Sequence, residues 1–202
     1  MALITREEKK SKLTIAEMDG NLTYLDNKVP YKVYTALLTQ SGASDEFRKD
    51  TGLLIIGITY YINYNSPGMD FTNVGAPNNN LGTYFVATGT TPNSWGGNEA
   101  LGPILLYNNG APVVTVLENT IGNIWFTYNN VGIYKVNSSG LFTGNKTIVF
   151  LGSVGDSDLS SGYTSRVFII DNTDIGISSL VETTPSLDNL LFNTPIEIRV
   201  YI

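Results

Sequence analysis

From Tyr31 onward, apolar and polar side chains alternate in short runs, and this two-residue period constrains the fold more than any other feature of the chain. Successive side chains of a β-strand point to opposite faces of a sheet, so alternation predicts strands with one buried face and one wet face. The run 196–202 is the clearest, with isoleucine or valine at every second position. Six further runs are predicted as strands: residues 31–39, 113–117, 123–128, 133–137, 147–151 and 166–170.

Turn-forming residues separate these runs at short intervals. The 202 residues include 20 Gly and 21 Asn, which cluster at positions such as 129–130, 137–140 and 143–145. Hydrophobic residues make up 42% of the chain, which is enough for a core. Charged residues make up 15%, against a usual share of about 25%. We therefore expect a mainly β chain, built as an antiparallel β-sandwich of the jelly-roll-like kind.

One N-terminal segment has a helical pattern instead. Thr14 and Glu17 have the spacing of a capping box, in which each side chain accepts a hydrogen bond from the other residue's backbone N–H. The predicted helix begins at Ile15 and ends before Pro30. At about 12 residues it is marginal as an isolated helix, so it needs a surface to pack on. The polar, charge-mixed arm of residues 1–12 is expected to order only against a partner.

The predicted helix is amphipathic. Its apolar residues recur at steps of three and four, which places them in one stripe. We predict that this stripe is an assembly interface, formed by Leu13, Ile15, Met18, Leu22 and Leu25. Packing on the parent sandwich and packing on a neighbouring subunit are both open at this point.

A change of composition divides the β-rich part of the chain. No Lys or Arg occurs between residues 51 and 134, and this stretch follows a charge cluster at 45–50. Within it, the runs 58–64 and 82–88 predict two paired strands of a small β unit. If strands 31–39 and 113–117 belong to one sheet, this unit is an insertion, which costs little extra loop-closure entropy. The expected domains are an assembly arm and helix (1–29), a discontinuous host β-sandwich (30–42 and 111–202) and an inserted small β module (43–110).

The residue types present exclude most catalytic designs. The chain contains no cysteine and no histidine, so it lacks thiolate nucleophiles, imidazole bases and the usual zinc ligands. Asp156 and Asp158 offer alternate oxygens to Ca²⁺, but the bidentate Glu of such loops is missing, and a solvated acidic loop is the simpler interpretation. A glycosidase-like pair of carboxylates from distant strands stays open. We expect no enzymatic activity, no cofactor and no metal site.

Net charge and hydropathy bear on the partners. A formal charge of -6 argues against nucleic acid, because binding along phosphates depends on Lys and Arg. The longest apolar runs fall far short of the roughly 20 residues that cross a bilayer, so no membrane partner is expected. Residues 1–10 lack the apolar core of a secretory signal, which predicts folding in the cytoplasm.

The aromatic residues fall into two groups. Those at strand positions are expected to be core residues or cross-strand pairs: Tyr60, Tyr64, Phe85, Trp125, Phe126 and Phe150. Trp95 lies instead in the turn-like segment 91–97. We predict it as a surface-binding residue, a platform for a sugar or an anchor between subunits. Packing over its own small domain is the alternative.

The N-terminal and host segments carry a resemblance to known proteins. Residues 12–25 read KLTIAEMDGNLTYL, and residues 31–42 read YKVYTALLTQSG. The first string resembles the LTxAEMDxNFxYL helix near the start of many structural proteins of tailed bacteriophages, especially marine and crAss-like phages. The second, together with residues 111–122, 145–149 and 193–201, is similar to a compact phage β domain.

The small β unit carries a second resemblance. Residues 68–76 read GMDFTNVGA and residues 85–95 read FVATGTTPNSW. They resemble a mobile phage module usually written GDDFTNVGA…FxATGTTPTxW. Met69 replaces an acid of that pattern, which weakens the idea of a shared metal site at Asp70.

These resemblances imply a virion structural protein of a phage without enzymatic activity. It would be a fibre, decoration or tail- or neck-associated component, located in the virion and assembled in the host cytoplasm. The expected partners are other virion proteins of the capsid or tail and further copies of the chain in a homo-oligomer, with a trimer favoured. The rival hypothesis is an adhesin-like module that binds a glycan on the host surface.

Overall fold

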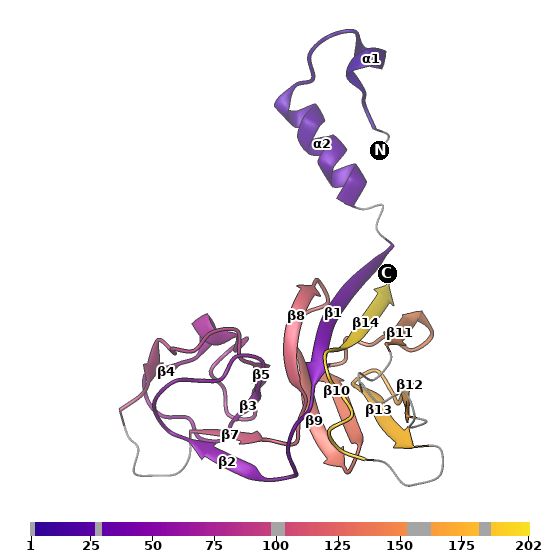
Figure 1. The fold of residues 1–202 in the computed structure, drawn as a ribbon. Coiled ribbons are helices and arrows are strands. Elements are labelled where there is room, and N and C mark those ends of the chain that lie inside the picture. Colours follow the sequence, from indigo (N-terminus) through magenta and orange to yellow (C-terminus); the bar gives the residue numbers. More distant parts are fainter. Residues whose placement is uncertain (1–2, 27–29, 98–103, 153–162, 182–186) are drawn as a thin grey trace.

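The computed structural model describes residues 3–26, 30–97, 104–152, 163–181 and 187–202. The chain is mainly β, with 43% of it in strands and 12% in helices, which confirms the predicted fold class. Two packed sheets form a sandwich body, a smaller β unit lies beside it, and two helices stand off the body as a stalk (Figure 1).

The sandwich body consists of two four-stranded antiparallel sheets. The first has the order β11-β14-β1-β8 and the second the order β12-β13-β10-β9. The strands of the first sheet are β1 (Tyr31–Thr39), β8 (Val113–Asn119), β11 (Thr147–Leu151), which follows a short 3-10 turn at Gly144–Lys146, and β14 (Thr194–Tyr201). Those of the second are β9 (Ile124–Asn130), β10 (Ile133–Ser138), β12 (Tyr163–Ile169) and β13 (Asp174–Val181). Alternate residues of both sheets fill one buried cluster, including Leu38, Phe126, Tyr134, Ile177 and Ile198.

The small module, residues 43–110, has a core of its own. Its main sheet has the order β2-β7-β3-β5, formed by Glu46–Lys49, Leu105–Asn108, Thr59–Ile62 and Tyr84–Val86. A two-stranded sheet of β4 (Met69–Asp70) and β6 (Ser94–Trp95) and a 3-10 turn η1 (Thr72–Val74) complete it. The buried residues include Tyr60, Ile62, Phe71, Phe85 and Leu105. The division into host and inserted domains stays a prediction, but its stated condition is met, because β1 pairs with β8.

The aromatic predictions are only partly right. Tyr60, Phe85 and Phe126 are fully buried, as expected. Phe150 is 52% exposed, because its position on β11 points away from the buried cluster. The charge cluster at 45–50 forms the edge strand β2, which the sequence did not predict. Charged side chains suit an edge strand because they discourage pairing with other chains.

The stalk is a hairpin of two helices, α1 (Arg6–Lys9) and α2 (Ile15–Asp26). The predicted capping box is present in α2, where the Glu17 N–H donates to Thr14 Oγ1 at 3.3 Å and the Thr14 N–H donates to Glu17 Oε2 at 2.7 Å. An ion pair between Lys9 and Glu17 ties the two helices together. These contacts, with the Lys9 bond as the largest cause, lower the pKa of Glu17 to about 2. The expectation that the arm orders only against a partner stays a prediction.

Asp70 ties together the two module segments that carry the second resemblance. Its Oδ1 accepts hydrogen bonds from the N–H and the hydroxyl of Thr72, at 2.9 and 2.7 Å, and its Oδ2 accepts one from Asn93 Nδ2 at 2.9 Å. Asn79 Nδ2 adds a longer bond at 3.3 Å. The bonds from Thr72, followed by those from Asn93 and Asn79, hold the pKa of Asp70 well below its usual range. Asp70 is thus a structural acceptor that fastens the turn at Thr72 to the loop at Asn93.

The module meets the sandwich body through a close backbone approach at Gly57. The Val114 N–H donates to the Gly57 carbonyl at 2.9 Å, and the Phe126 N–H donates to Thr59 Oγ1 at 3.2 Å. Gly57 has a φ of +85°, and a Cβ there would lie 2.6 Å from the Val114 carbonyl oxygen. Glycine is required at this position both by its conformation and by the lack of space.

We expect Gly57→Ala to destabilise the protein more than the matched variant Gly52→Ala. The φ is +82° at Gly52 and +85° at Gly57, so alanine brings about 1–2 kcal/mol of left-handed strain at either position. Nothing lies within 4 Å of a Cβ at Gly52, whereas at Gly57 the new carbon overlaps the Val114 backbone and should cost at least about 2 kcal/mol more. Urea unfolding measures both values. Equal free energies of unfolding for the two variants would contradict the close approach.

Asp70→Asn is expected to lower the melting temperature near neutral pH and to flatten its dependence on acid. Because the pKa of Asp70 is depressed in the folded state, its ionised form stabilises the fold above the usual value of 3.8, and that contribution is lost as the pH falls further. Melting curves from about pH 2 to about pH 6 test this. Asp19→Asn, in the exposed part of α2, is the control and should follow the wild-type profile; identical profiles for all three proteins would refute the role of Asp70.

Candidate functional site

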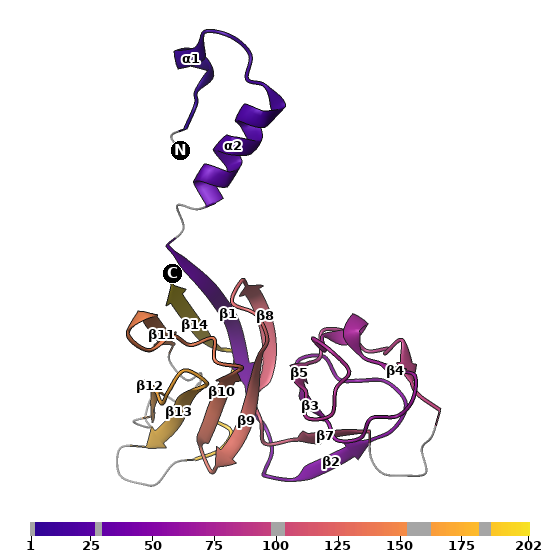
Figure 2. The same ribbon diagram turned by 180° about the vertical axis from the view of Figure 1, so that it is seen from behind.

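The predicted assembly stripe lies on α2, outside the sandwich body (Figures 1 and 2). Ile15 is 74% exposed, Met18 44% and Leu22 65%, and Leu13 is partly exposed. The side chain of Leu25 lies outside the described residues. Ile15, Met18 and Leu22 follow one another at steps of three and four, so they share a helix face. Large apolar side chains on one helix face, with no part of the described chain covering them, are typical of an interface with another molecule.

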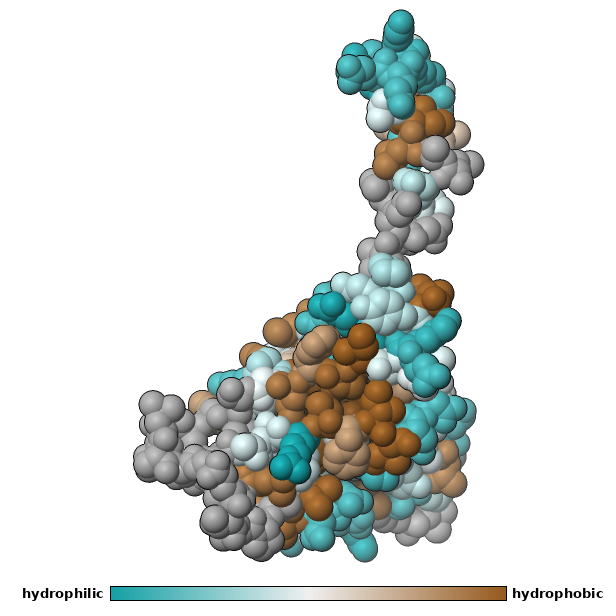
Figure 3. Space-filling model, turned by 90° about the vertical axis from the view of Figure 1, so that its right-hand side faces the viewer, coloured by the Kyte–Doolittle hydropathy of each residue, from teal (hydrophilic) through white to brown (hydrophobic). Residues whose placement is uncertain are grey.

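The tip of the stalk is charged. α1 consists of Arg6, Glu7, Glu8 and Lys9, and none of these residues is buried. In the space-filling view the hydrophilic tip stands above apolar side chains on the stalk (Figure 3). Neither α1 nor α2 has the length and hydropathy of a membrane-crossing helix, and the same holds for the rest of the described chain.

The sandwich body has an apolar outer face as well. Leu117 is 63% exposed and lines a shallow groove with Phe150 and Pro195. The guanidinium of Arg199 lies 5.5 Å from the ring centre of Phe150. In Figure 3, which faces the side of the body where β11 lies, apolar residues form one contiguous area beneath the stalk.

Trp95 is placed by the structure against the core of its own module. It pairs with Met69 in the sheet of β4 and β6, and its ring meets Phe71 edge-on with the ring centres 5.2 Å apart. It is only partly exposed and packs against the buried cluster of the module. The predicted role of Trp95 in surface binding stays a prediction, and this packing corresponds to the alternative interpretation.

A cleft of about 410 Å³ separates the small module from β9. We call it the tyrosine cleft, and its lining includes Glu46, Tyr61, Tyr84, Asn108, Thr127 and Tyr128. Neither Tyr61 nor Tyr84 is among the site residues predicted from the sequence. They alternate along their strands with the buried Tyr60 and Phe85, so they lie on the opposite face of the module sheet. This alternation is the sequence signal from which their exposure could have been predicted.

Three aromatic rings follow one another at this junction, and two of them, Tyr61 and Tyr84, line the cleft. Tyr61 and Tyr84 are a cross-strand pair of β3 and β5, with ring centres 4.6 Å apart. Tyr84 stacks on Trp125 of β9 with the ring centres 5.5 Å apart and the planes 7° from parallel. We call Tyr61, Tyr84 and Trp125 the aromatic ledge. It joins the module to the sandwich body.

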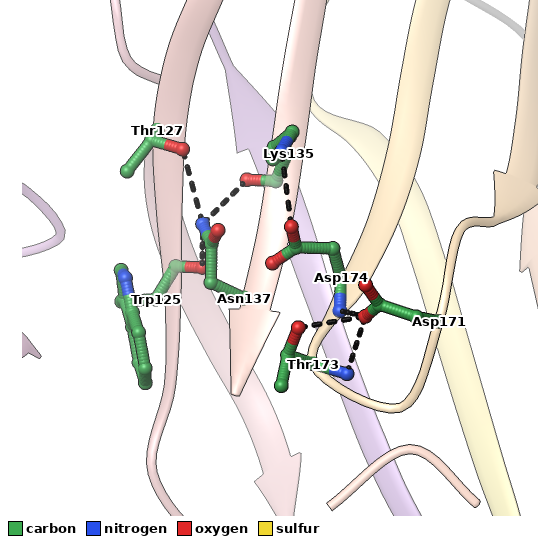
Figure 4. A network of polar contacts seen from close by, with 7 residues as sticks. All are labelled: Trp125, Thr127, Lys135, Asn137, Asp171, Thr173 and Asp174. Carbon is green, nitrogen blue, oxygen red and sulfur yellow. Dashed lines mark hydrogen bonds and ion pairs between the residues drawn. The ribbon is translucent and has the colours of Figure 1, made fainter. Parts of the chain in front are cut away.

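A polar network behind the cleft fixes β9 against its neighbour β10 (Figure 4). Asn137 Nδ2 donates to Thr127 Oγ1 at 3.1 Å and to the Trp125 carbonyl at 3.3 Å. Lys135 Nζ forms an ion pair with Asp174 Oδ2 at 2.9 Å. The Asn137 bonds join β10 to the strand that carries Trp125 and Thr127, and the ion pair joins β10 to β13 on its other side.

Asp171 closes the turn at the end of the same network (Figure 4). Its Oδ1 accepts hydrogen bonds from the Thr173 hydroxyl at 2.6 Å, the Thr173 N–H at 2.7 Å and the Asp174 N–H at 2.9 Å. These bonds, those of Thr173 being the largest cause, lower the pKa of Asp171. This turn sets the position of Asp174, whose carboxylate accepts the hydrogen bond from Lys135 Nζ.

Within the described ranges, no group of three or more acidic residues is arranged to hold a metal ion. Both carboxylate oxygens of Asp70 already accept hydrogen bonds inside the module. The loop with Asp156 and Asp158 lies outside the described residues. Among the described residues that line the tyrosine cleft, Glu46 is the one carboxylate, whereas a glycosidase pair needs two.

No protein-family model, no curated protein and no solved structure matches this chain. Its function is therefore inferred from its own residues and surfaces.

Proposed function

We propose that this chain is a structural component of a phage virion that acts through oligomerisation and attachment to other virion proteins. A fibre, a decoration protein or a tail- or neck-associated protein would fit this role. The single observation that carries the proposal is the apolar face of α2, where Ile15, Met18 and Leu22 are all exposed. The assignment to a phage virion itself rests on the sequence resemblance of three sets of residues: 12–25; 31–42 with 111–122, 145–149 and 193–201; and 68–76 with 85–95.

The stripe suits contact with other copies of the chain. Burial of a side chain such as Ile, Leu or Met contributes about 1.5–3 kcal/mol before ordering costs. The burial free energies of three such residues from each of several symmetric copies add together. They stabilise a helical bundle, because each further contact in the same assembly costs little extra association entropy. We favour a trimer among the possible homo-oligomers.

The charged tip suits a different contact. α1 places Arg6, Glu7, Glu8 and Lys9 beyond the apolar stripe, and the ion pair between Lys9 and Glu17 keeps the two helices together. Exposed charges of both signs contribute more to orientation and partner choice than to affinity. We assign this tip to the capsid or tail partner, and the stripe below it to self-association.

The proposal involves no catalysis. The tyrosine cleft has a single carboxylate among its described lining residues. The chain contains no histidine to serve as a base and no cysteine to serve as a nucleophile. The apolar groove at Leu117 and Phe150 adds a second exposed surface of the kind that assembling proteins bury. These features support a role in assembly.

The paired substitution Ile15→Gln with Leu22→Gln tests the proposal, because glutamine keeps helix propensity while removing the apolar surface. We expect the wild type to be an oligomer of the 22.0 kDa chain and the variant to be a monomer with an unchanged β fold, as measured by light scattering after size exclusion. Leu81→Gln is the control, since Leu81 is 62% exposed in the small module and should leave the oligomer intact.

Removal of residues 1–27 should have the same effect as the paired substitution. A wild-type protein that is a uniform monomer, and whose size and stability do not change when these residues are removed, would contradict the proposal. An oligomer that persists in both altered proteins would place self-association on another surface, and the role of α2 would be wrong.

A further inference from the structure

The tyrosine cleft has the features of a binding site that the assembly proposal leaves unused. It is bounded on one side by β2, β3, β5 and β7 of the small module and on the other by β9, and the two lie side by side in both ribbon views (Figures 1 and 2). Its volume of about 410 Å³ falls within the range of small-molecule sites in proteins. This inference does not depend on the assembly role of α2.

The walls of the cleft are held at a fixed separation. The Asn123 Nδ2 donates to the Tyr84 carbonyl at 2.9 Å, and the Phe126 N–H donates to Thr59 Oγ1 at 3.2 Å. Both bonds run between β9 or its preceding turn and the module. A site whose walls are already in place loses little free energy to ordering when a ligand binds.

The polar groups of the cleft have free hydrogen-bonding capacity. Within the described part of the chain, the hydroxyls of Tyr61 and Tyr84 make no hydrogen bond, and the carboxylate of Glu46 makes neither a hydrogen bond nor an ion pair. Burial, followed by the nearby Tyr61 and Glu46, raises the pKa of Tyr84, so its phenol stays protonated at neutral pH. The cleft therefore presents O–H donors beside a carboxylate acceptor.

The charge of the cleft limits the chemistry of a ligand. No Lys or Arg is among the described residues that line it, and Glu46 is its one charged side chain. Lys135, the cation of the network in Figure 4, is paired with Asp174. An anionic ligand such as a sialylated or sulfated glycan would meet Glu46 without a compensating cation.

The aromatic side chains of the cleft, Tyr61 and Tyr84 on the module wall and Tyr128 on β9, offer flat surface to a sugar ring. The planes of Tyr84 and Trp125 are 7° from parallel, and those of Tyr61 and Tyr84 differ by 42°. A ledge of rings presents electron-rich aromatic surface to the partially positive C–H groups on one face of a pyranose ring.

We propose that the tyrosine cleft binds a neutral oligosaccharide, with Tyr61 and Tyr84 stacking on a pyranose ring and Glu46 accepting hydrogen bonds from its hydroxyl groups. Asn108 and Thr127 lie on opposite walls and contact further hydroxyls. This site is separate from the one predicted at Trp95, whose ring packs on Phe71.

The test uses the full chain and calorimetric titration with maltohexaose, cellohexaose, laminarihexaose and mannohexaose as neutral probes, and with sialyllactose and choline as charged probes. We expect saturable binding of at least one neutral probe with a dissociation constant between about 10 μM and about 1 mM. Because Trp125 stacks on Tyr84, the same titration should also change the tryptophan fluorescence.

Three variants locate the site. Tyr61→Ala should weaken binding roughly tenfold or more, and Glu46→Gln should weaken it severalfold. Tyr201→Ala is the matched control, because Tyr201 belongs to another cross-strand tyrosine pair, with Tyr31, on the sandwich body, and binding should be unchanged. Circular dichroism checks the fold of each variant. If Tyr61→Ala does not fold, Glu46→Gln decides, since Glu46 is exposed on the edge strand β2.

Three results would overturn the inference. The first is the failure of every neutral probe to bind. The second is binding that neither Tyr61→Ala nor Glu46→Gln weakens. The third is tighter binding of sialyllactose or choline than of any neutral probe, which would assign the cleft to an anionic or a cationic ligand. None of these results bears on the oligomeric state, so they leave the assembly proposal to its own test.

Discussion

The pairing of β1 with β8 is the constraint on which the rest of the structure depends. The chain leaves the first sheet after Thr39 and returns to the adjacent strand at Val113, so everything between must close on itself beside that sheet. The small module meets this requirement with its own buried cluster, and Gly57 lets its backbone reach Val114. The tyrosine cleft lies between this module and β9, because the module is bonded both to β8 at Val114 and to β9 at Phe126.

Much of the fold could be predicted from local pattern. Two-residue alternation located β1, β8, β10 and β14, since half-buried strands need it, and the Thr14 capping box located the start of α2. Patterns of this kind contain no information on long-range geometry. The shift of register between β1 and β8 at Thr35 and Ala36, the edge strand β2 and the exposure of Phe150 all depend on which strands become neighbours.

The candidate sites divide in the same way. The α2 stripe is a property of one helix, so residue spacing sufficed to find Ile15, Met18 and Leu22. The aromatic ledge draws Tyr61, Tyr84 and Trp125 from three strands in two separate sheets, and no spacing along the chain places them together. Trp95 was singled out because it stands in a turn, yet the turn folds back and its ring meets Phe71.

The stalk and the cleft lie at different parts of the molecule. β2 and β7, which border the cleft, belong to the small module and lie at its end away from the helices (Figure 1). Copies gathered through their stalks would keep every cleft open and arrange them around a common axis. Each site could then be individually weak while the array as a whole holds a repetitive surface, because release requires all contacts to break at once and the remaining ones keep the local concentration high.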